Sequence, residues 1–565
     1  MSSHTAWFIK RKIIGSLLLS SAVALVSACS GTSSSSSATG GTTSSAGTTT
    51  SSTGTTASSS AAAISSNPIV ASSSSIAVIS SSSTATASSS SAGTSSPVFT
   101  SGTNGIFRVN PQGKVTKNGQ VMPVRCGNWF GLEGQHEEAG GAPMELYIGN
   151  MWWDNTGRTL DKDMAEIKGL GFNTIRLPIA PQTLVKGHPD GKGYRDLNAP
   201  ANLKGENLKN TYSTYKYADA YSAMIGFIET AKTANVNVMI DIHSCSNYVG
   251  WRAGRLDQSP PYVDKDRGAD YKFTRENYSC GTGGPGVTVH AYNETKWLND
   301  IKTIAILAKD HPNVIGIDIF NEPWDYSWDQ WATLAEKAYK VIEENNPNIL
   351  IFVQGISGGN STNKEEPHGD AGSNPNWGEN LYGFHTRPLK IPQDRLVISP
   401  HTYGPAVYQQ MHFMDLAKDP TCEGLHGEEA AKHKCDMNMQ YTRLKPGWEE
   451  HFGFLRDMGY AVVVGEWGGN RYWPTGGGAR QAEADAWKHL THGTGEANID
   501  FQWQKHFGRY MKEEQIDSCY WGINPESSDT GGVFEHIYAT DGKSWGKWGS
   551  VDNLKMNLIK NTWGL

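Results

Sequence analysis

Eight short apolar segments constrain the fold of this chain more than any other feature. They cover residues 124–130, 174–180, 236–243, 314–321, 349–354, 397–403, 461–467 and 518–524. Segments with the amphipathic pattern of helices lie between several of them, at 215–234, 294–310, 328–345 and 499–515. Strands that alternate with helices form βαβ units and a parallel sheet. Eight such units predict an α/β fold in which the strands close into a (β/α)₈ TIM barrel.

Long loops after the strands are the second expected property of this barrel. The folded part is longer than the ~250 residues typical of the fold, and the longest segments between elements follow the strands. They cover residues 131–160, 181–214, 244–293, 355–395, 404–446 and 470–498. Before the first strand, Asn118-Gly119 between two short apolar runs predicts a β-hairpin over 115–121. An open doubly wound sheet is the alternative, but no Gly-rich fingerprint follows the first strand.

The N-terminus carries the pattern of an export signal. Basic residues at 10–12 precede an apolar stretch at 13–26, which is too short to span a bilayer comfortably. The stretch ends in Val-Ser-Ala before Cys29, which resembles a bacterial lipobox. This resemblance implies that residues 1–29 are a lipoprotein signal, that Cys29 anchors the chain to a membrane, and that the protein is displayed at the outer membrane or cell surface. A secreted protein with an ordinary cleaved signal peptide is the alternative.

A tether and one folded domain are expected after Cys29. Residues 30–103 are almost all Ser, Thr, Ala and Gly, with no aromatic residue before Phe99. Such a segment buries too little apolar surface to fold, so we expect a disordered linker. Residues 104–565 contain no second low-complexity break and are expected to form the barrel domain. With a net charge of −7, the chain has no basic excess that would indicate a nucleic-acid partner. We expect a monomer.

Six cysteines remain after Cys29, an even number for an oxidising compartment. We expect disulfides between Cys245 and Cys280 and between Cys422 and Cys435, because each pair lies within one long loop. Cys126 and Cys519 fall in the first and eighth strands, which adjoin in a closed barrel. They could pair, or remain two buried thiols.

Polar residues gather where the predicted strands end. They are Arg176, His243, Asn321, Glu322, His401, Tyr403, Glu466 and Trp521. Strands buried on both faces should be continuously apolar. Charged groups there are costly to bury unless they pair with an opposite charge or take part in the function. The catalytic residues of this fold lie at the ends of the strands.

Two of these residues have the chemistry that glycoside hydrolysis requires. One carboxyl serves as acid and base, and the other as nucleophile or as base toward water. Glu322 and Glu466 follow the fourth and seventh strands, so they can face each other across the barrel mouth. Arg176 can hold a neighbouring carboxylate ionised, and Asn321 can donate a hydrogen bond to a sugar hydroxyl.

Several motifs resemble those of family 5 glycoside hydrolases. Asn321-Glu322-Pro323 is similar to the acid/base signature, and the segment 464–469 (Val-Gly-Glu-Trp-Gly-Gly) is similar to the nucleophile strand. The segment 399–405 (Ser-Pro-His-Thr-Tyr-Gly-Pro) resembles the sixth strand of bacterial cellulases, and 524–532 resembles the eighth-strand motif. Ile523 stands where cellulases often have a second Trp, and the loop 131–153 is longer and more acidic than usual.

The resemblance spans about 105–565 and implies a role for each residue. Glu322 would be the acid/base and Glu466 the nucleophile. His401 would lie near the acid/base, the Tyr403 hydroxyl would bond the nucleophile, and Trp521 would form the floor of the sugar site. Arg176 and His243 match residues on the second and third strands. The implied reaction is retaining, endo-acting hydrolysis of β-1,4-glucosidic bonds in cellulose or related β-glucans, without a cofactor. Mannan, xyloglucan and mixed-linkage glucan are alternative substrates.

Three other interpretations remain open at the level of sequence. A metal-dependent hydrolase could use His243, His401, Asp241 and Asp318 as ligands, although the His-x-His usual on the first strand of that class is missing. A catalytically dead, glycan-binding surface lipoprotein would be expected to lack a carboxylate, and both are present. Asp264, Asp266 and Asp270 could bind Ca²⁺, but their spacing departs from the EF-hand pattern.

Overall fold

A computed structural model describes most of the segment after the predicted linker. The described residues are 105–133, 135–136, 145–146, 159–187, 219–244, 292–359, 364–474, 485–490, 493–525, 527, 530–537 and 547–565. The export signal, the linker, the Cys245–Cys280 pair, Asp264, Asp266, Asp270 and most of the acidic loop 131–153 lie outside them. Within the described part of the chain, no helix combines the length and the apolar character needed to cross a membrane.

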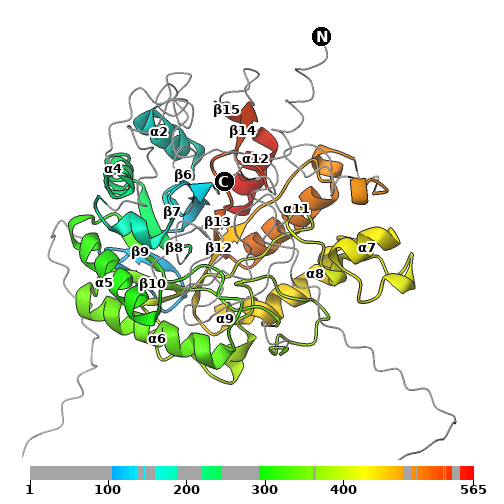
Figure 1. Ribbon diagram of the computed structural model, residues 1–565, viewed down its shortest axis with the longest axis horizontal. Coiled ribbons are helices and arrows are strands. Elements are labelled where there is room, and N and C mark those ends of the chain that lie inside the picture. Colours follow the sequence, from blue (N-terminus) through cyan, green and yellow to red (C-terminus); the bar gives the residue numbers. More distant parts are fainter. Residues whose placement is uncertain are drawn as a thin grey trace, which may run out of the picture. The chain divides into compact units, whose positions relative to one another are not determined.

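Eight parallel strands form a closed barrel, as the sequence predicts (Figure 1). In order around the ring they are β4 (Arg125–Asn128), β7 (Thr174–Ile179), β8 (Asn237–Ile242), β9 (Val314–Asp318), β10 (Leu350–Val353), β11 (Leu396–Ile398), β12 (Ala461–Trp467) and β13 (Asp517–Tyr520). Each of the eight overlaps one predicted apolar segment. All residues of β7, β8 and β12 are buried, which explains their nearly continuous apolar sequence.

Helices lie outside the ring of strands (Figure 1). The longer ones are α2 (Leu160–Leu170), α4 (Ala220–Thr233), α5 (Glu294–Asp310), α6 (Trp328–Asn345), α11 (Ile499–Glu513) and α12 (Asn553–Thr562). The shorter α7 (Gly427–His433), α8 (Tyr441–Trp448) and α9 (Phe454–Asp457) precede β12. Two helices have the predicted bounds, and α4 begins later than predicted because the Asp219 side chain caps it by accepting a hydrogen bond from Ser222 N–H.

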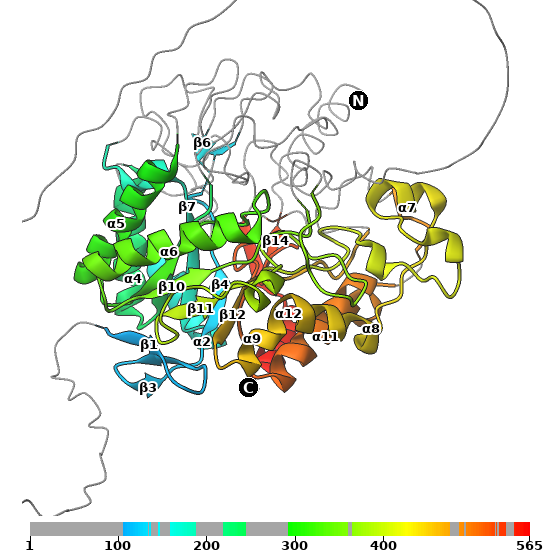
Figure 2. The same ribbon diagram turned by 90° about the horizontal axis from the view of Figure 1, so that it is seen from below.

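A small antiparallel sheet covers the end of the barrel where the strands begin. It contains β1 (Phe107–Val109), β2 (Val115–Lys117) and β3 (Gln120–Val121), and Figure 2 shows it at one edge of the ring. The predicted hairpin joins β2 to β3, and Asn118 and Gly119 have φ of 52° and 79°, as a type I′ turn requires. Two further hairpins were not foreseen: β5 (Gln135–His136) with β6 (Glu145–Leu146), and β14 (Phe534–Ile537) with β15 (Lys547–Val551).

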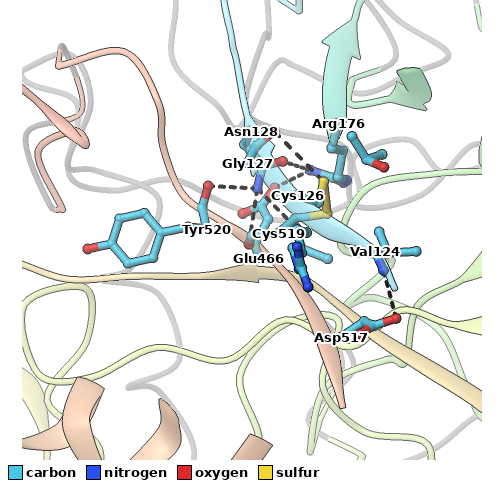
Figure 3. Close-up of a disulfide and its surroundings, with 12 residues drawn as sticks. Val124, Cys126, Gly127, Asn128, Arg176, Glu466, Asp517, Cys519 and Tyr520 are labelled. Atoms are coloured by element: carbon cyan, nitrogen blue, oxygen red, sulfur yellow. Dashed lines mark hydrogen bonds and ion pairs between the residues drawn. A yellow bond between two sulfur atoms is a disulfide. The ribbon is translucent and has the colours of Figure 1, made fainter. Parts of the chain in front are cut away.

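Two disulfides are present in the described residues. Cys422–Cys435 confirms the prediction for that loop. Cys126–Cys519 joins β4 to β13 at the closure of the ring, so the alternative of two buried thiols is wrong for this pair (Figure 3). Its 393-residue sequence separation closes a very long loop, for which a chain-entropy model gives a stabilisation of about 6 kcal/mol.

Candidate active site

The site residues predicted from the sequence come together in one cluster. Glu466 lies near the carboxyl end of β12. Arg176 does not end its strand, as the sequence suggested, but is the third of six residues in β7, and its side chain reaches Glu466. The other predicted residues follow directly on four more strands: His243 on β8, Asn321 and Glu322 on β9, His401 and Tyr403 on β11, and Trp521 on β13. Hydrogen bonds, ion pairs and ring stacking connect all of them into one cluster.

Arg176 is the centre of this cluster and is fully buried. Its guanidinium group contacts three carboxylates, with N–O distances of 2.6 Å to Glu466, 2.9 Å to Asp318 and 3.0 Å to Asp241. Burial alone lowers the pKa of Arg176, but the three carboxylates outweigh it and raise that pKa above its usual value. Its Nη2 also donates to Oδ1 of Asn321 at 2.9 Å, which leaves the Asn321 amide nitrogen as a donor.

Glu466 is held by a hydrogen-bond donor at each carboxylate oxygen. Arg176 Nη1 donates to Oε1 at 2.6 Å, and the Tyr403 hydroxyl donates to Oε2 at 2.6 Å. Burial raises the pKa of Glu466, while Arg176, His243 and the Tyr403 hydroxyl act to lower it. Burial and the charge of Glu466 raise the pKa of Tyr403 well above its usual value, so Tyr403 remains a donor.

Glu322 has a different environment. Its side chain is 21% exposed, against 5% for Glu466. Among the described contacts it has no direct ion pair with an arginine. Burial and the negative charge of Glu466 raise the pKa of Glu322 well above its usual range. Arg176 and the Tyr403 hydroxyl therefore favour the ionised form of Glu466, and no described contact of that kind favours ionisation of Glu322.

His401 lies between the two carboxyls. Its Nδ1 is 3.1 Å from Glu322 Oε1 and 3.6 Å from Glu466 Oε2. Burial lowers the pKa of His401 well below its usual value, so the ring is neutral. The nearest nitrogen and oxygen atoms of these three side chains all lie within 4.8 Å of one another. An oxygen of Glu322 thus lies within 4.8 Å of an oxygen of Glu466, which is shorter than the ~6.5–9.5 Å separation of inverting glycosidases.

His243 and Trp521 form another part of the cluster, with His243 Nδ1 4.0 Å from Glu466 Oε1. Nδ1 of His243 lies 2.7 Å from Oδ2 of Asp241, and burial lowers the pKa of His243 to about 4. The neutral ring therefore donates its Nδ1–H to Asp241. Trp521 is half-buried, and its ring is nearly parallel to those of His243 and Phe130, with centroid distances of 5.6 and 5.2 Å. The part of the indole that remains exposed suits contact with the apolar face of a sugar ring.

Two functional residues were missed from the sequence, although they follow the same rule as the others. Asn128 ends the first strand, and its Oδ1 accepts from Arg176 at 3.0 Å (Figure 3). Its Nδ2 donates to Gly465 O at 3.0 Å. Gln354 ends the fifth predicted segment and bonds both Asp318 and the Glu322 backbone. In both cases the sequence carried the same signal, a polar residue at the end of an apolar strand.

Gly465, which precedes Glu466, occupies a position with no room for a larger residue. A Cβ at Gly465 would lie 2.6 Å from Ser399 Oγ and 2.7 Å from His401 Nε2, closer than real Cβ contacts. Ile523, which stands where a second Trp is common, is fully buried, and its side chain fills the space beside Gly127. It therefore belongs to the core and not to the exposed sugar site.

The metal-hydrolase interpretation conflicts with the observed contacts. Two of its four ligands, Asp241 and Asp318, are ion-paired with Arg176. Burial raises the pKa of each of these carboxyls to about 7, although Arg176 opposes the rise. An arginine in contact with both carboxylates supplies the positive charge that a metal would bring, and it disfavours a cation beside it.

Comparison with known proteins gives one consistent family. "Endoglucanase C" of Cellvibrio japonicus is 48% identical over 487 residues, covering 82% of this chain and 62% of that protein. The chain thus spans less than two thirds of that relative's length. The "Major extracellular endoglucanase" of Xanthomonas campestris is 26% identical over 481 residues, covering 83% of this chain and 72% of the relative.

Solved structures support the fold. The catalytic domain of the major endoglucanase from Xanthomonas campestris matches with a TM-score of 0.52 and 23% identity, over 81% of this chain and all of that one. A hyperthermophilic endocellulase from Pyrococcus horikoshii gives the same TM-score and identity, and the match covers 81% of this chain and 98% of that one. The family model "Cellulase (glycosyl hydrolase family 5)" matches residues 122–527, well over half of the chain. This protein therefore belongs to the cellulase family, glycosyl hydrolase family 5.

Proposed function

We propose that this protein hydrolyses internal β-1,4-glucosidic bonds of cellulose or related β-glucans, with Glu466 as the nucleophile and Glu322 as the acid/base. The observation that carries the proposal is the pair of neighbouring carboxyls in unequal environments. Glu466 has an arginine and a hydroxyl on its oxygens, and among the residues that the structure describes Glu322 has neither. The names of the relatives support the endo-acting glucanase over the other candidate substrates.

The contacts fit a two-step reaction. Glu466, ionised beside Arg176, attacks the anomeric carbon while Glu322 gives its proton to the departing glycosidic oxygen. A water molecule then replaces the departed sugar, and Glu322 takes its proton as the water attacks the glycosyl ester. The Tyr403 hydroxyl and Arg176 keep the nucleophile in place, and Trp521 supports the sugar ring.

We predict retention of the anomeric configuration. The closeness of the two carboxyls leaves no room for a water molecule between Glu466 and the sugar, because the inverting arrangement needs ~6.5–9.5 Å. Proton NMR of a fresh digest of cellohexaose should show the β-anomer first, followed by mutarotation. An initial α-anomer would rule out Glu466 as a nucleophile.

The preferred glucan is a separate question that an activity panel addresses. The same protein should be assayed on carboxymethylcellulose, mannan, xyloglucan and barley glucan. We expect the largest kcat/KM on carboxymethylcellulose or barley glucan. A dominant rate on mannan or xyloglucan would keep the mechanism and change the substrate.

We also propose that the enzyme is exported and held at the cell surface by lipid on Cys29. The support is the sequence at 10–29, together with the word "extracellular" in the name of the Xanthomonas relative. A flexible linker over 30–103 would have an end-to-end distance on the order of 45 Å. That reach lets a barrel domain meet a long glucan that cannot cross the outer membrane.

Replacing the anchor residue tests this part of the proposal. We expect Cys29→Ala to move the enzyme from the membrane fraction to the soluble fraction without changing kcat, because the residue lies outside the barrel. Immunoblots of fractionated cells give the distribution, and protease treatment of intact cells separates surface display from the periplasm. Unchanged membrane fractionation of the variant would show that Cys29 is not the anchor.

A further inference from the structure

Gln354 follows β10 and is fully buried beside the segment that carries Glu322. Both ends of its side-chain amide are used. Nε2 donates to the two carboxylate oxygens of Asp318 at 2.9 and 3.0 Å, and Oε1 accepts from the Glu322 backbone N–H at 2.8 Å. Because a carboxylate accepts and a backbone N–H donates, the amide has only one workable orientation.

The backbone of Gln354 is also fixed. Its carbonyl oxygen accepts a hydrogen bond from the indole nitrogen of Trp331 at 2.8 Å, and Trp331 is fully buried in α6. The residue is therefore anchored through its main chain to the outer helix and through its side chain to the barrel interior. Such an anchor can hold a neighbouring peptide group in an unfavourable conformation.

Glu322 has that kind of conformation. Its φ is +44°, in the left-handed region that favours glycine, and it precedes Pro323, which ordinarily keeps the previous residue extended. Backbone strain of this kind persists only where surrounding contacts hold it. The described contacts on Glu322's own peptide groups are two: the N–H bonds Gln354, and the C=O accepts from Trp324 N–H at 2.7 Å.

A continuous chain of contacts then links the two glutamates. Arg176 contacts Glu466 at 2.6 Å and Asp318 at 2.9 Å. Asp318 accepts from Gln354, and Gln354 accepts from Glu322 N–H. The backbone of one carboxyl-bearing residue is thus held by the same network that contacts the carboxylate of the other.

We propose that Gln354 is a positioning residue for the acid/base: by holding the Glu322 N–H, it keeps the left-handed backbone that aims the Glu322 carboxyl at the glycosidic oxygen. Gln354 itself touches neither substrate nor the reacting atoms. The proposal rests on the function proposed above, in which Glu322 transfers the proton.

The central variant is Gln354→Met, which keeps the length of the side chain and removes both hydrogen-bonding ends. On cellohexaose, whose leaving group needs an acid, we expect kcat/KM to fall about 10²-fold, a typical share of general-acid catalysis. On 2,4-dinitrophenyl cellobioside, which needs no acid, kcat/KM should fall less than about threefold. Azide should raise kcat on the second substrate and give β-cellobiosyl azide, because a displaced Glu322 no longer activates water.

Two conservative variants separate positioning from folding. Gln354→Asn keeps a buried amide but withdraws its oxygen from the Glu322 N–H, so it should show the same selective loss in a folded protein. Gln354→Glu keeps an acceptor oxygen at full length and, when its carboxyl is protonated, can donate to Asp318. We expect it to retain kcat/KM on cellohexaose within about fivefold of the parent, on the same acid-dependence argument.

Asn346 supplies a matched control at the other end of β10. It is buried, its Nδ2 donates to Ala305 O at 3.1 Å, and its Oδ1 accepts from Asn348 N–H at 3.1 Å. Asn346→Leu thus also removes a buried bridging amide, far from the reacting groups. It should lower Tm as Gln354→Met does, yet leave the ratio of the two kcat/KM values and the response to azide unchanged.

The outcomes are distinct. Equal losses of Gln354→Met on both substrates, a parental substrate ratio in Gln354→Asn, or a Gln354→Glu variant as defective as Gln354→Met would each overturn the proposal. Glu322→Ala, assayed in parallel, must itself show the selective loss and rescue by azide. If Glu322→Ala does not, the acid/base assignment fails. If it does and the Gln354 variants do not, only the positioning role fails.

Discussion

Glu466→Gln is expected to lower kcat on the order of 10⁵-fold while cellohexaose binding changes less than about threefold. The amide has nearly the same shape as the carboxylate, so the cleft keeps its form. It cannot form the glycosyl ester, however, and it no longer pairs with the charge of Arg176. Single-turnover kinetics give the rate, and isothermal titration of cellohexaose gives the affinity.

Asp517 offers a matched control for this substitution. It is a largely buried carboxyl at the start of β13, where Oδ2 accepts from Val124 N–H at 2.8 Å (Figure 3). Asp517→Asn also changes a carboxyl into an amide, but at the opposite end of the barrel, so kcat should stay within about twofold of the parent, as for an independent site. A Glu466→Gln variant that keeps a tenth of the parental kcat would refute the nucleophile assignment.

Glu322→Gln should reduce kcat/KM on cellohexaose by about 10²–10⁴-fold, the usual contribution of a general acid. On 2,4-dinitrophenyl cellobioside the loss should be small, because that leaving group departs without a proton. Identical losses on the two substrates would contradict the acid role. This contrast with Glu466→Gln, which should lose both reactions, separates the two glutamates.

The pH profile gives an independent measure of the same assignment. The active form requires an ionised Glu466 and a protonated Glu322, so activity falls as pH rises through the pKa of Glu322. Because that pKa lies well above the usual value, the alkaline limb of kcat/KM should lie well above pH 4.5 in the parent. When the Glu322→Gln variant is assayed on the activated substrate, the alkaline limb of its kcat/KM profile should disappear. If the limb persists, another group is titrating.

Much of the barrel could be predicted because each strand is buried on both faces. The segments at 174–180 and 461–467 are apolar almost throughout, and helical periodicity gave the bounds of α5 and α6. The small hairpins β5–β6 and β14–β15 could not be found in this way. They lie in loops, and two-stranded elements of two to five residues carry no periodic signal of their own.

The candidate site could be predicted where the residue type itself indicates a chemical role. Glu322 and Glu466 are charged groups at the ends of apolar strands, and such groups are costly to bury without a purpose. Asn128 and Gln354 are neutral amides, and an amide at a strand end fits a cap or turn equally well. Sequence also could not show that Arg176 contacts three carboxylates at once, because those contacts join strands far apart in the chain.

The junction between β4 and β13 has a consequence for damaged or incomplete copies of the chain. These two strands are the first and last of the barrel in sequence, and Cys126–Cys519 crosslinks them. A polypeptide cut after Glu466 but before β13 would contain both glutamates and still lack the neighbour that β4 and β12 both need. A chain truncated there should therefore be inert, and synthesis becomes productive only when the final strand arrives. A single cut in the folded, oxidised protein has a different result, because Cys126–Cys519 keeps β13 joined to β4.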